Sequence, residues 1–331
     1  ILVHVDAASW PEKQRRGSGQ AEMDLDEVVA VGHKRGAALV IASKPPTRPS
    51  VIPILLVPNT YEALIALARF ARARFQGRVI AVTGTAGKIA TRDILVRLLA
   101  RIGKTSGPHG NWNSVSGIAM GVASLPADGA FAVIEIGGGT LAGSRRRTLD
   151  MIRHDDAIIT TIGINHTSRS STPAVTAKVM ARLFQALPPS GRAYWPRDIA
   201  EVDILQAAVG DRQIRVVGDP ALSTIALEAM ECGLDWMRLK VTADRYTQEI
   251  KTQATVSGPL TNLALAAQCA YDLGVPAETI AEVIADYSPY KRKNEWVHLN
   301  IRGKSVVMLD DCHNATLISF ENVLSRLRKF K

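Results

Sequence analysis

The stretch VIAVTGTAGKIATRDILVRLLARIG, residues 79–103, contains the strongest fold signal in the chain. It begins with an apolar run typical of a buried strand. After two glycines it continues with the apolar spacing of an amphipathic helix. Glycines let a loop curl so that its N–H groups converge on an anion, and the start of a helix adds about half a positive charge there. Lys88 follows the second glycine, where it would reach the terminal phosphates of a nucleotide. This order predicts a phosphate-binding loop.

The same loop departs from the strict P-loop sequence at two positions. That sequence has Gly six residues before the Lys and Ser or Thr directly after it, whereas these positions hold Val82 and Ile89 here. Ile89 has no hydroxyl group for Mg²⁺. Thr91 does not substitute for it, because two residues further along a helix is roughly 200° around the axis. Taken alone, the loop is compatible with an ATP site and with a turn that binds nothing.

Apolar strands alternate with helices along most of the chain. From residue 78 to 293 the alternation predicts a central P-loop-type domain with a mostly parallel sheet covered on both faces. Residues 1–77 have the pattern of a smaller N-terminal α/β domain. Residues 294–331 hold one strand and one helix, which predicts the beginning of a Rossmann-like C-terminal domain. That domain is expected to be incomplete, because a parallel sheet needs several such units. The fold class is therefore α/β.

Composition narrows the possible partners and the compartment. Among 331 residues there is no apolar run of the roughly 18 residues that a membrane span needs, so no membrane partner is expected. The net charge of +9 fits either an anionic ligand or a basic surface. Nucleic acid is an unlikely partner because no stacking aromatics are interleaved with the basic residues. Three widely spaced cysteines without a CxxC pair predict a reducing cytoplasm and no zinc site.

Several short motifs follow one another in a specific order. They are AVTGTAGK (81–88), HGNWNS (109–114), AVIEIGGG (132–139), IGINHT (162–167), LTN (260–262) and DDCHNA (310–315). This order resembles the Mur ligases, most closely those that add D-alanyl-D-alanine to a muramoyl tripeptide, from about residue 25 to 331. Such enzymes use ATP to convert a carboxylate into an acyl phosphate. An amine then displaces the phosphate and forms an amide.

The resemblance implies how ATP would be bound. It assigns nucleotide contacts to six positions: Gly84, Thr85, Gly87, Lys88, Asn262 and Asn314. The first four form the phosphate loop. Asn262 matches an asparagine that contacts adenine, although the His-Asn pair that precedes it in the family is absent. Asn111 and Asn113 match a loop on the substrate side.

The resemblance also implies the catalytic set, which is Lys88, Glu135, His166 and Asp311. Glu135 stands at the end of an apolar strand and His166 in the INHT motif. Both would hold Mg²⁺, for which a carboxylate is a suitable hard ligand. Asp311, in DDCHNA, would help to position the nucleotide from the third domain.

Further departures from the family pattern predict a weakened magnesium site. Met180 stands where the family has a carbamylated lysine, and a thioether is a poor ligand for Mg²⁺. Lys178 is two residues away and on another face of the helix. In the linker, PYKRKNE (289–295) replaces Pro-Gly-Arg, leaving Arg292 or Lys293 to supply a cation.

These patterns support one main hypothesis and two alternatives. The main one is an ATP-dependent ligase that joins a carboxylate to an amine, with a weakened magnesium site. A non-catalytic Mur-like subunit that binds a nucleotide or a partner protein is the first alternative. An unrelated P-loop ATPase or kinase is the second. The C-terminal strand and helix are too small to fold alone, so missing residues of the chain, a second copy or a partner protein should cover them.

Overall fold

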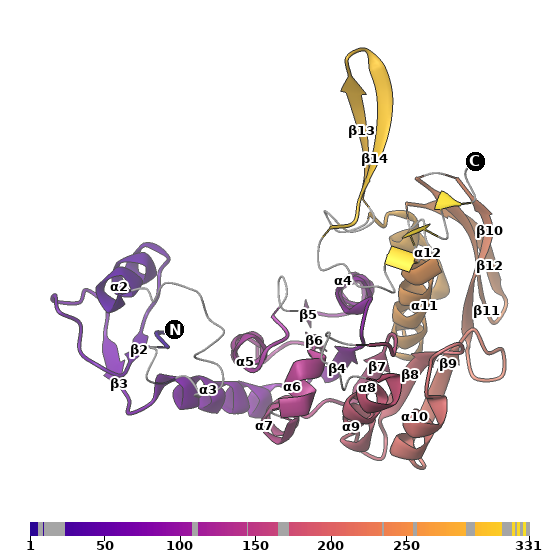
Figure 1. The fold of residues 1–331 in the computed structure, drawn as a ribbon. Coiled ribbons are helices and arrows are strands. Elements are labelled where there is room, and N and C mark those ends of the chain that lie inside the picture. Colours follow the sequence, from indigo (N-terminus) through magenta and orange to yellow (C-terminus); the bar gives the residue numbers. More distant parts are fainter. Residues whose placement is uncertain are drawn as a thin grey trace.

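A computed structural model gives the fold of the chain (Figure 1). It describes residues 1–5, 9, 24–107, 112–143, 145–164, 172–233, 235–253, 257–288, 295–312, 320, 321, 323, 324, 327 and 328. An N-terminal unit lies at one end, and a central α/β body lies in the middle. An antiparallel sheet packs on the far side of the body, and a hairpin projects from it. This arrangement confirms the α/β fold class.

The N-terminal unit is a small parallel sheet with one helix. Its sheet has the order β1 (Leu2–Val3), β2 (Val40–Ala42), β3 (Ile54–Leu56). Helix α2 (Leu25–Lys34) covers it and shares with it a small apolar core. This is the minor α/β unit expected at the start of the chain.

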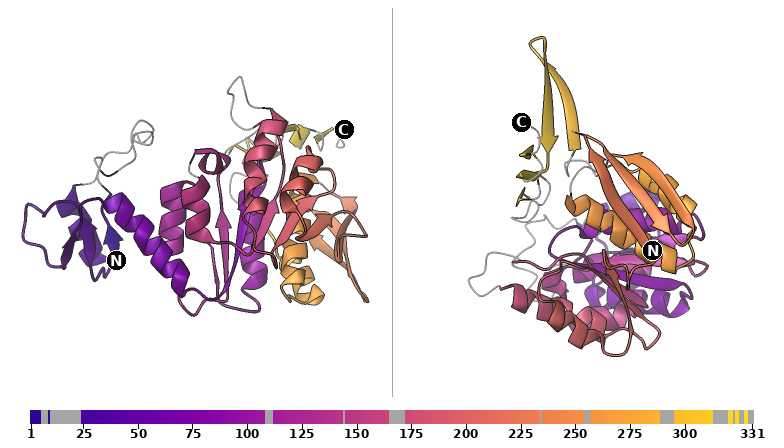
Figure 2. Two further views of the ribbon diagram at one scale, coloured as in Figure 1. Left: turned by 90° about the horizontal axis from the view of Figure 1, so that it is seen from below. Right: turned by 90° about the vertical axis from the view of Figure 1, so that its right-hand side faces the viewer.

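Helix α3 (Thr60–Arg74) joins this unit to the central body, as Figure 2 shows. Asn59 caps it, because its side-chain oxygen accepts from the Glu62 N–H at 3.0 Å. The buried face of α3, which includes Tyr61, Leu64 and Ile65, belongs to the core of the central body. The helix therefore anchors the N-terminal unit on the larger one.

The central sheet is parallel throughout its length. Its strands have the spatial order β5 (Thr105–Ser106), β6 (Phe131–Glu135), β4 (Arg78–Thr83), β7 (Asp156–Ile159), β8 (Arg192–Pro196) and β9 (Gln213–Val217). Every neighbouring pair in this order is parallel. The mostly parallel sheet predicted from the alternation of strands and helices is confirmed.

Strand β4 shows how the sheet separates two cores. Val79 and Ala81 point into one core, and Ile80 and Val82 point into the other. The helices on the first side are α3, α5 (Val115–Ala123), α6 (Gly138–Gly143), α7 (Arg145–Ile152), α8 (Pro173–Met180), α9 (Arg182–Gln185) and α10 (Val202–Val209). On the second side lie α4 (Lys88–Leu99) and α11 (Ser257–Asp272).

The polar, β-forming stretch after the central sheet forms a separate antiparallel sheet. Its strands are β10 (Ile225–Cys232), β11 (Met237–Ala243) and β12 (Tyr246–Thr252), in that order. Alternate residues such as Leu239 and Val241 face the second core, where α11 and α12 (Ala277–Ala285) pack. The other face of the sheet is largely polar and exposed, which explains the mixed composition of this stretch.

At the C-terminal side a hairpin projects from the body (Figures 1 and 2). It consists of β13 (Glu295–Ile301) and β14 (Lys304–Asp310), joined by Arg302 and Gly303, which both have positive φ. The strand predicted after the linker is present as β14. Its antiparallel partner β13 was not expected, because no element was predicted between the linker, which ends at residue 295, and that strand. Residues 320, 321, 323, 324 and 327 are helical, within the helix expected there.

No helix among the described residues is long and apolar enough to cross a membrane.

Candidate functional site

The glycine-rich loop lies at the carboxyl end of β4, at the point where the path of the chain reverses. From β4 the chain builds β5 and β6 on one side and then crosses to β7 on the other. In open parallel sheets, ligands bind outside the carboxyl ends of the strands at such a reversal. The neighbouring strand ends bring Glu135 of β6 and Thr160, which follows β7, to the same edge.

Gly84 and Gly87 of the loop could not be replaced by larger residues in their surroundings. Gly84 has φ 145°, and a Cβ there would lie 2.0 Å from Thr160 Oγ1. Gly87 has φ 85°, and a Cβ there would lie 2.2 Å from Asn262 Oδ1. A larger residue at either position would combine backbone strain with a clash. Asn262, on α11, is thereby placed directly against the loop.

The segment that follows β7 holds the loop in shape. The Thr85 N–H donates to the Thr161 carbonyl at 3.0 Å, and the Ala86 N–H donates to Thr161 Oγ1 at 2.9 Å. In return, Thr85 Oγ1 accepts from the Gly163 N–H at 2.9 Å. Two N–H groups of the loop are therefore bound to protein. The anion-binding capacity lies in the first turn of α4, whose N–H groups have no partner within a helix.

Lys88 begins α4 and folds back over the loop. Its Nζ donates to the Gly84 carbonyl at 2.8 Å. Gly87 caps the helix in the left-handed conformation and offers no side chain of its own. A cationic group and a helix start thus converge on the same space, which is the arrangement that binds phosphate.

Glu135 is completely buried and has both carboxylate oxygens engaged. Its Oε2 accepts from Arg92 Nη1 at 3.1 Å, and its Oε1 accepts from Asn113 Nδ2 at 2.8 Å. Arg92 is also paired with Asp93, at 2.8 Å between Nη2 and Oδ1. Sequence reasoning missed Arg92. The available signal was its position four residues after Lys88, which puts both side chains on one face of α4.

Three other described positions discussed for the metal site, Met180, Lys178 and Thr91, do not form a set of ligands with Glu135. Met180 is buried in the apolar core with Leu183 and Phe184, whereas Lys178 is exposed. Thr91 is buried and its hydroxyl group has no hydrogen-bond partner in the structure. Within the part of the chain that is described, no three His, Cys, Asp or Glu side chains cluster as metal ligands would.

The structure locates only some of the remaining predicted site residues. Asp311 follows β14 directly, at the base of the hairpin. His166, Asn314 and Asn111 lie outside the described residues.

Near α4, the pKa of Tyr287 is raised to about 12, first by burial and then by the negative charge of Asp93. This tyrosine therefore stays neutral at physiological pH and adds no negative charge beside Asp93.

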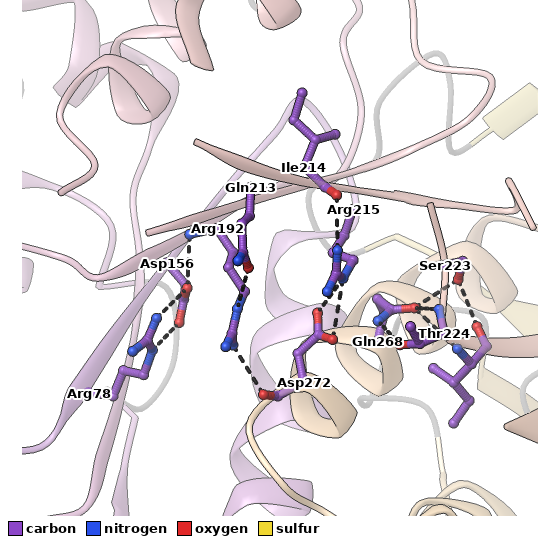
Figure 3. Close-up of polar contacts among 11 residues, drawn as sticks. Arg78, Asp156, Arg192, Gln213, Ile214, Arg215, Ser223, Thr224, Gln268 and Asp272 are labelled. Atoms are coloured by element: carbon purple, nitrogen blue, oxygen red, sulfur yellow. Dashed lines mark hydrogen bonds and ion pairs between the residues drawn. The ribbon is translucent and has the colours of Figure 1, made fainter. Parts of the chain in front are cut away.

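A second polar cluster lies at the opposite, amino-terminal ends of the strands (Figure 3). Buried Asp156 of β7 accepts from Arg78 Nη2 of β4 at 2.9 Å and from the Arg192 N–H of β8 at 3.1 Å. The hydrogen bond to Asp156 raises the pKa of Arg78. Arg215 of β9 pairs with Asp272 of α11 at 3.1 Å. These contacts join strands to each other and to α11, far from the glycine-rich loop, so their role is structural.

Solved structures with the same fold include the Mur ligase MurF from two organisms. MurF from Acinetobacter baumannii superimposes with a TM-score of 0.79 at 20% identity, over 100% of this chain and 71% of that chain. MurF from Thermotoga maritima in complex with ADP gives a TM-score of 0.76 at 19% identity, over 100% and 75%. At these identities the likeness establishes the fold.

Two sequence relatives share the name UDP-N-acetylmuramoyl-tripeptide--D-alanyl-D-alanine ligase. The protein from Mycobacterium tuberculosis H37Rv is 24% identical over 321 residues, which cover 89% of this chain and 61% of the relative. That from Escherichia coli K12 is 28% identical over 179 residues, 54% of this chain and 39% of the relative. The chain thus spans about three fifths of the length of the mycobacterial relative.

The sequence model of the Mur ligase middle domain matches residues 82–269, from the end of β4 to the last turn of α11. The match covers more than half of the chain and includes the loop, the parallel sheet from β6 to β9, and the antiparallel sheet. The chain belongs to the Mur ligase family.

Proposed function

We propose that this protein binds ATP at the glycine-rich loop and takes part in forming an amide bond between a carboxylate and an amine, through an acyl phosphate. The observation that carries the proposal is the convergence of Lys88, the start of α4 and Asn262 on one loop. The names of the relatives, and a structural neighbour in complex with ADP, support the same reading. Because all of these relatives are named ligases, the non-catalytic alternative gains no support from them.

The proposed roles follow from charge and position. Lys88 binds the transferring phosphoryl group, and Gly84, Thr85 and Gly87 shape the loop around it. Catalysis of phosphoryl transfer rests on positioning and electrostatic stabilisation, so no protein nucleophile is needed. Asn262 contacts the nucleotide from α11.

Further roles are proposed for Asp311 and Asn314, near the end of the chain, and for His166 in the INHT motif. Asp311 and Asn314 position the nucleotide from the C-terminal region. His166 would be a ligand of Mg²⁺ if that ion is bound. These assignments rest on motif order. In the domain arrangement we propose, residues 1–77 bind substrate, 78–293 bind ATP and 294–331 begin the C-terminal domain.

Magnesium is the cofactor that the described residues fit least well. A Mg²⁺ site in this family of folds would need Glu135 as a ligand, but both of its oxygens are bound to protein donors. Ile89 and Met180 offer no oxygen. We therefore expect magnesium to add little to nucleotide affinity, and we assign no step of the reaction to it.

The exposed apolar residues of the hairpin support the proposal that other residues cover it in the assembled protein. Ile301, Val306, Val307 and Met308 on it are all at least 38% exposed. Apolar side chains gathered on a two-stranded ribbon favour coverage by further residues of the protein, by a second copy or by a partner. A cytoplasmic location is proposed on the ground that all three cysteines are free.

The nucleotide site is tested by titrating ATP and ADP against wild type and Lys88→Ala. We expect roughly 10–100-fold weaker binding in the variant, the usual effect of losing a charge-assisted hydrogen bond. Lys104→Ala is the matched control, because Lys104 is exposed and pairs with Asp128 at 2.7 Å. Equal affinity of wild type and Lys88→Ala would refute the assignment of the loop.

A further inference from the structure

The contact between Arg92 and Glu135 joins two buried, opposite charges beside the phosphate loop. The Arg92 side chain is 3% exposed and that of Glu135 is 0% exposed. A buried carboxylate is costly unless it is paired and hydrogen-bonded. Glu135 meets this requirement through Arg92 at 3.1 Å and Asn113 at 2.8 Å. Both carboxylate oxygens of Glu135 therefore have partners within the protein.

Arg92 is well suited to be a permanent counter-charge. A guanidinium stays protonated at any physiological pH and presents its donors in a rigid plane. Asp93 holds the same guanidinium through Nε at 2.9 Å and Nη2 at 2.8 Å. With a carboxylate on either side, the guanidinium is fixed in position.

A divalent cation on Glu135 would compete with this arrangement. Ligand oxygens lie about 2.0–2.6 Å from Mg²⁺ or Ca²⁺, and Arg92 Nη1 is 3.1 Å from Oε2. A cation on that oxygen would thus lie within roughly 6 Å of the guanidinium and be repelled by it. Ile89 and Met180, which stand where the family pattern has metal-binding side chains, supply no side-chain oxygen to offset the repulsion.

We propose that Arg92 takes the place of a divalent cation at Glu135, so that nucleotide binding at this loop is independent of Mg²⁺. The first half of this statement concerns the protein alone. The second half rests on the proposed nucleotide site. The two halves are tested by different measurements.

The first test measures divalent-cation binding without nucleotide. Mn²⁺ binding is followed by electron paramagnetic resonance and thermal unfolding is measured with and without Mg²⁺. The variants are Arg92→Met, Glu135→Gln and Arg92→Met/Glu135→Gln. Arg97→Met, an exposed change on the same helix, is the control.

We expect wild type to show no Glu135-dependent Mn²⁺ binding and no shift in its midpoint with Mg²⁺. Arg92→Met should unfold roughly 5–15 °C lower, because a buried charge loses its partner. It should recover part of that loss with Mg²⁺ and bind Mn²⁺ at least roughly tenfold more tightly than wild type. The double variant should lose both responses.

Two outcomes would overturn the first half. One is Mn²⁺ binding by wild type that Glu135→Gln abolishes, and this comparison does not need Arg92→Met to fold. The other is a folded Arg92→Met that gains no Mn²⁺ binding, because the carboxylate would then not lie in a cation position.

The second test is calorimetry with ADP in EDTA and in Mg²⁺. We expect the wild-type dissociation constants to agree within about threefold. A loss of more than about tenfold in EDTA would overturn the second half. If ADP binds in neither condition, the proposed nucleotide site fails, whereas the Mn²⁺ measurements still decide the role of Arg92.

Discussion

At the scale of single residues, two kinds of constraint act at the loop. The backbone conformation requires glycine at two positions, and polar contacts hold two cationic side chains in place. Gly84 and Gly87 are required by positive φ and by close neighbours. Lys88 and Arg92 lie on one face of α4, but they have different partners. Lys88 contacts the loop carbonyl of Gly84, whereas Arg92 pairs with Glu135. Of these two cations, only Lys88 has a phosphate-binding role in the proposed function.

One residue outside the site makes stability depend on pH. His154 is buried, its Nε2 bonds to the Leu183 carbonyl at 2.9 Å, and its Nδ1 has no partner. Burial lowers the pKa of His154 from 6.5 to about 4. The folded state therefore binds this proton less readily than the unfolded state. The stabilisation is complete above pH 6.5 and is lost as pH falls towards 4.

We expect His154 to account for about 3 kcal/mol of acid destabilisation between pH 7 and pH 4. His154→Gln keeps a donor for Leu183 and removes the titration, so its unfolding free energy should fall less over that range. Urea unfolding of both proteins at several pH values measures the difference. Parallel pH profiles for the two would contradict this account.

At the scale of elements, the central sheet is held differently at its two ends. The carboxyl ends of β4, β6 and β7 are shaped by the loop and its hydrogen bonds. The amino ends are joined by charged side chains, with Asp156 between β4 and β8 (Figure 3). The edge proposed to bind the nucleotide is therefore separate from the edge at which charged side chains join the strands.

Asp156→Ala should lower the unfolding free energy by about 2–4 kcal/mol, because it leaves Arg78 and the Arg192 N–H without their buried acceptor. Denaturant unfolding gives the value. Asp128→Ala, which removes an exposed ion pair with Lys104, should leave the midpoint unchanged. Similar losses of unfolding free energy in the two variants would show that the buried cluster around Asp156 stabilises the fold no more than an exposed ion pair does. Nucleotide affinity should not change in either folded variant.

At the scale of the whole molecule, the hairpin stands away from the body (Figure 1). Apolar side chains on it, such as Val306 and Met308, are exposed. Each large apolar side chain left in water forgoes about 1.5–3 kcal/mol of burial free energy. Coverage of this ribbon would also bring Asp311 at its base into a defined geometry, which a catalytic role requires.

We expect the backbone amides of β13 and β14 to be protected from hydrogen exchange in the complete, assembled protein. Mass spectrometry of exchange, with light scattering to establish the oligomeric state, tests this. Val307→Lys should weaken that protection, whereas Lys304→Gln, at the exposed start of β14, should not. Exchange of residues 295–310 as fast as in an unfolded chain would refute the coverage of the hairpin and the proposed role of Asp311.

The amino-acid sequence by itself determined which segments form strands, turns and helices, and in what order, over most of the chain. The strand, glycine turn and helix over residues 79–103 follow from apolar periodicity and from the freedom of glycine, which act over a few residues. The parallel sheet follows from the same alternation repeated along the chain. The family resemblance also came from the sequence, because it rests on the order of short motifs along the chain and needs no knowledge of which residues are in contact. Strand β13 was missed because apolar and polar residues are mixed in it, and it is stabilised as a strand only by pairing with β14.

Only the tertiary structure decided what each site residue contacts. Periodicity indicates which side of a strand or helix is buried, but it does not say which buried sides meet. Glu135 was expected to hold a metal, and it is bound by Arg92, 43 residues away, and by Asn113, 22 residues away. Met180 was considered as a replaced ligand and lies in the apolar core. The charge balance of a buried group depends on every neighbour within a few ångströms, and those neighbours come together only when the chain is folded.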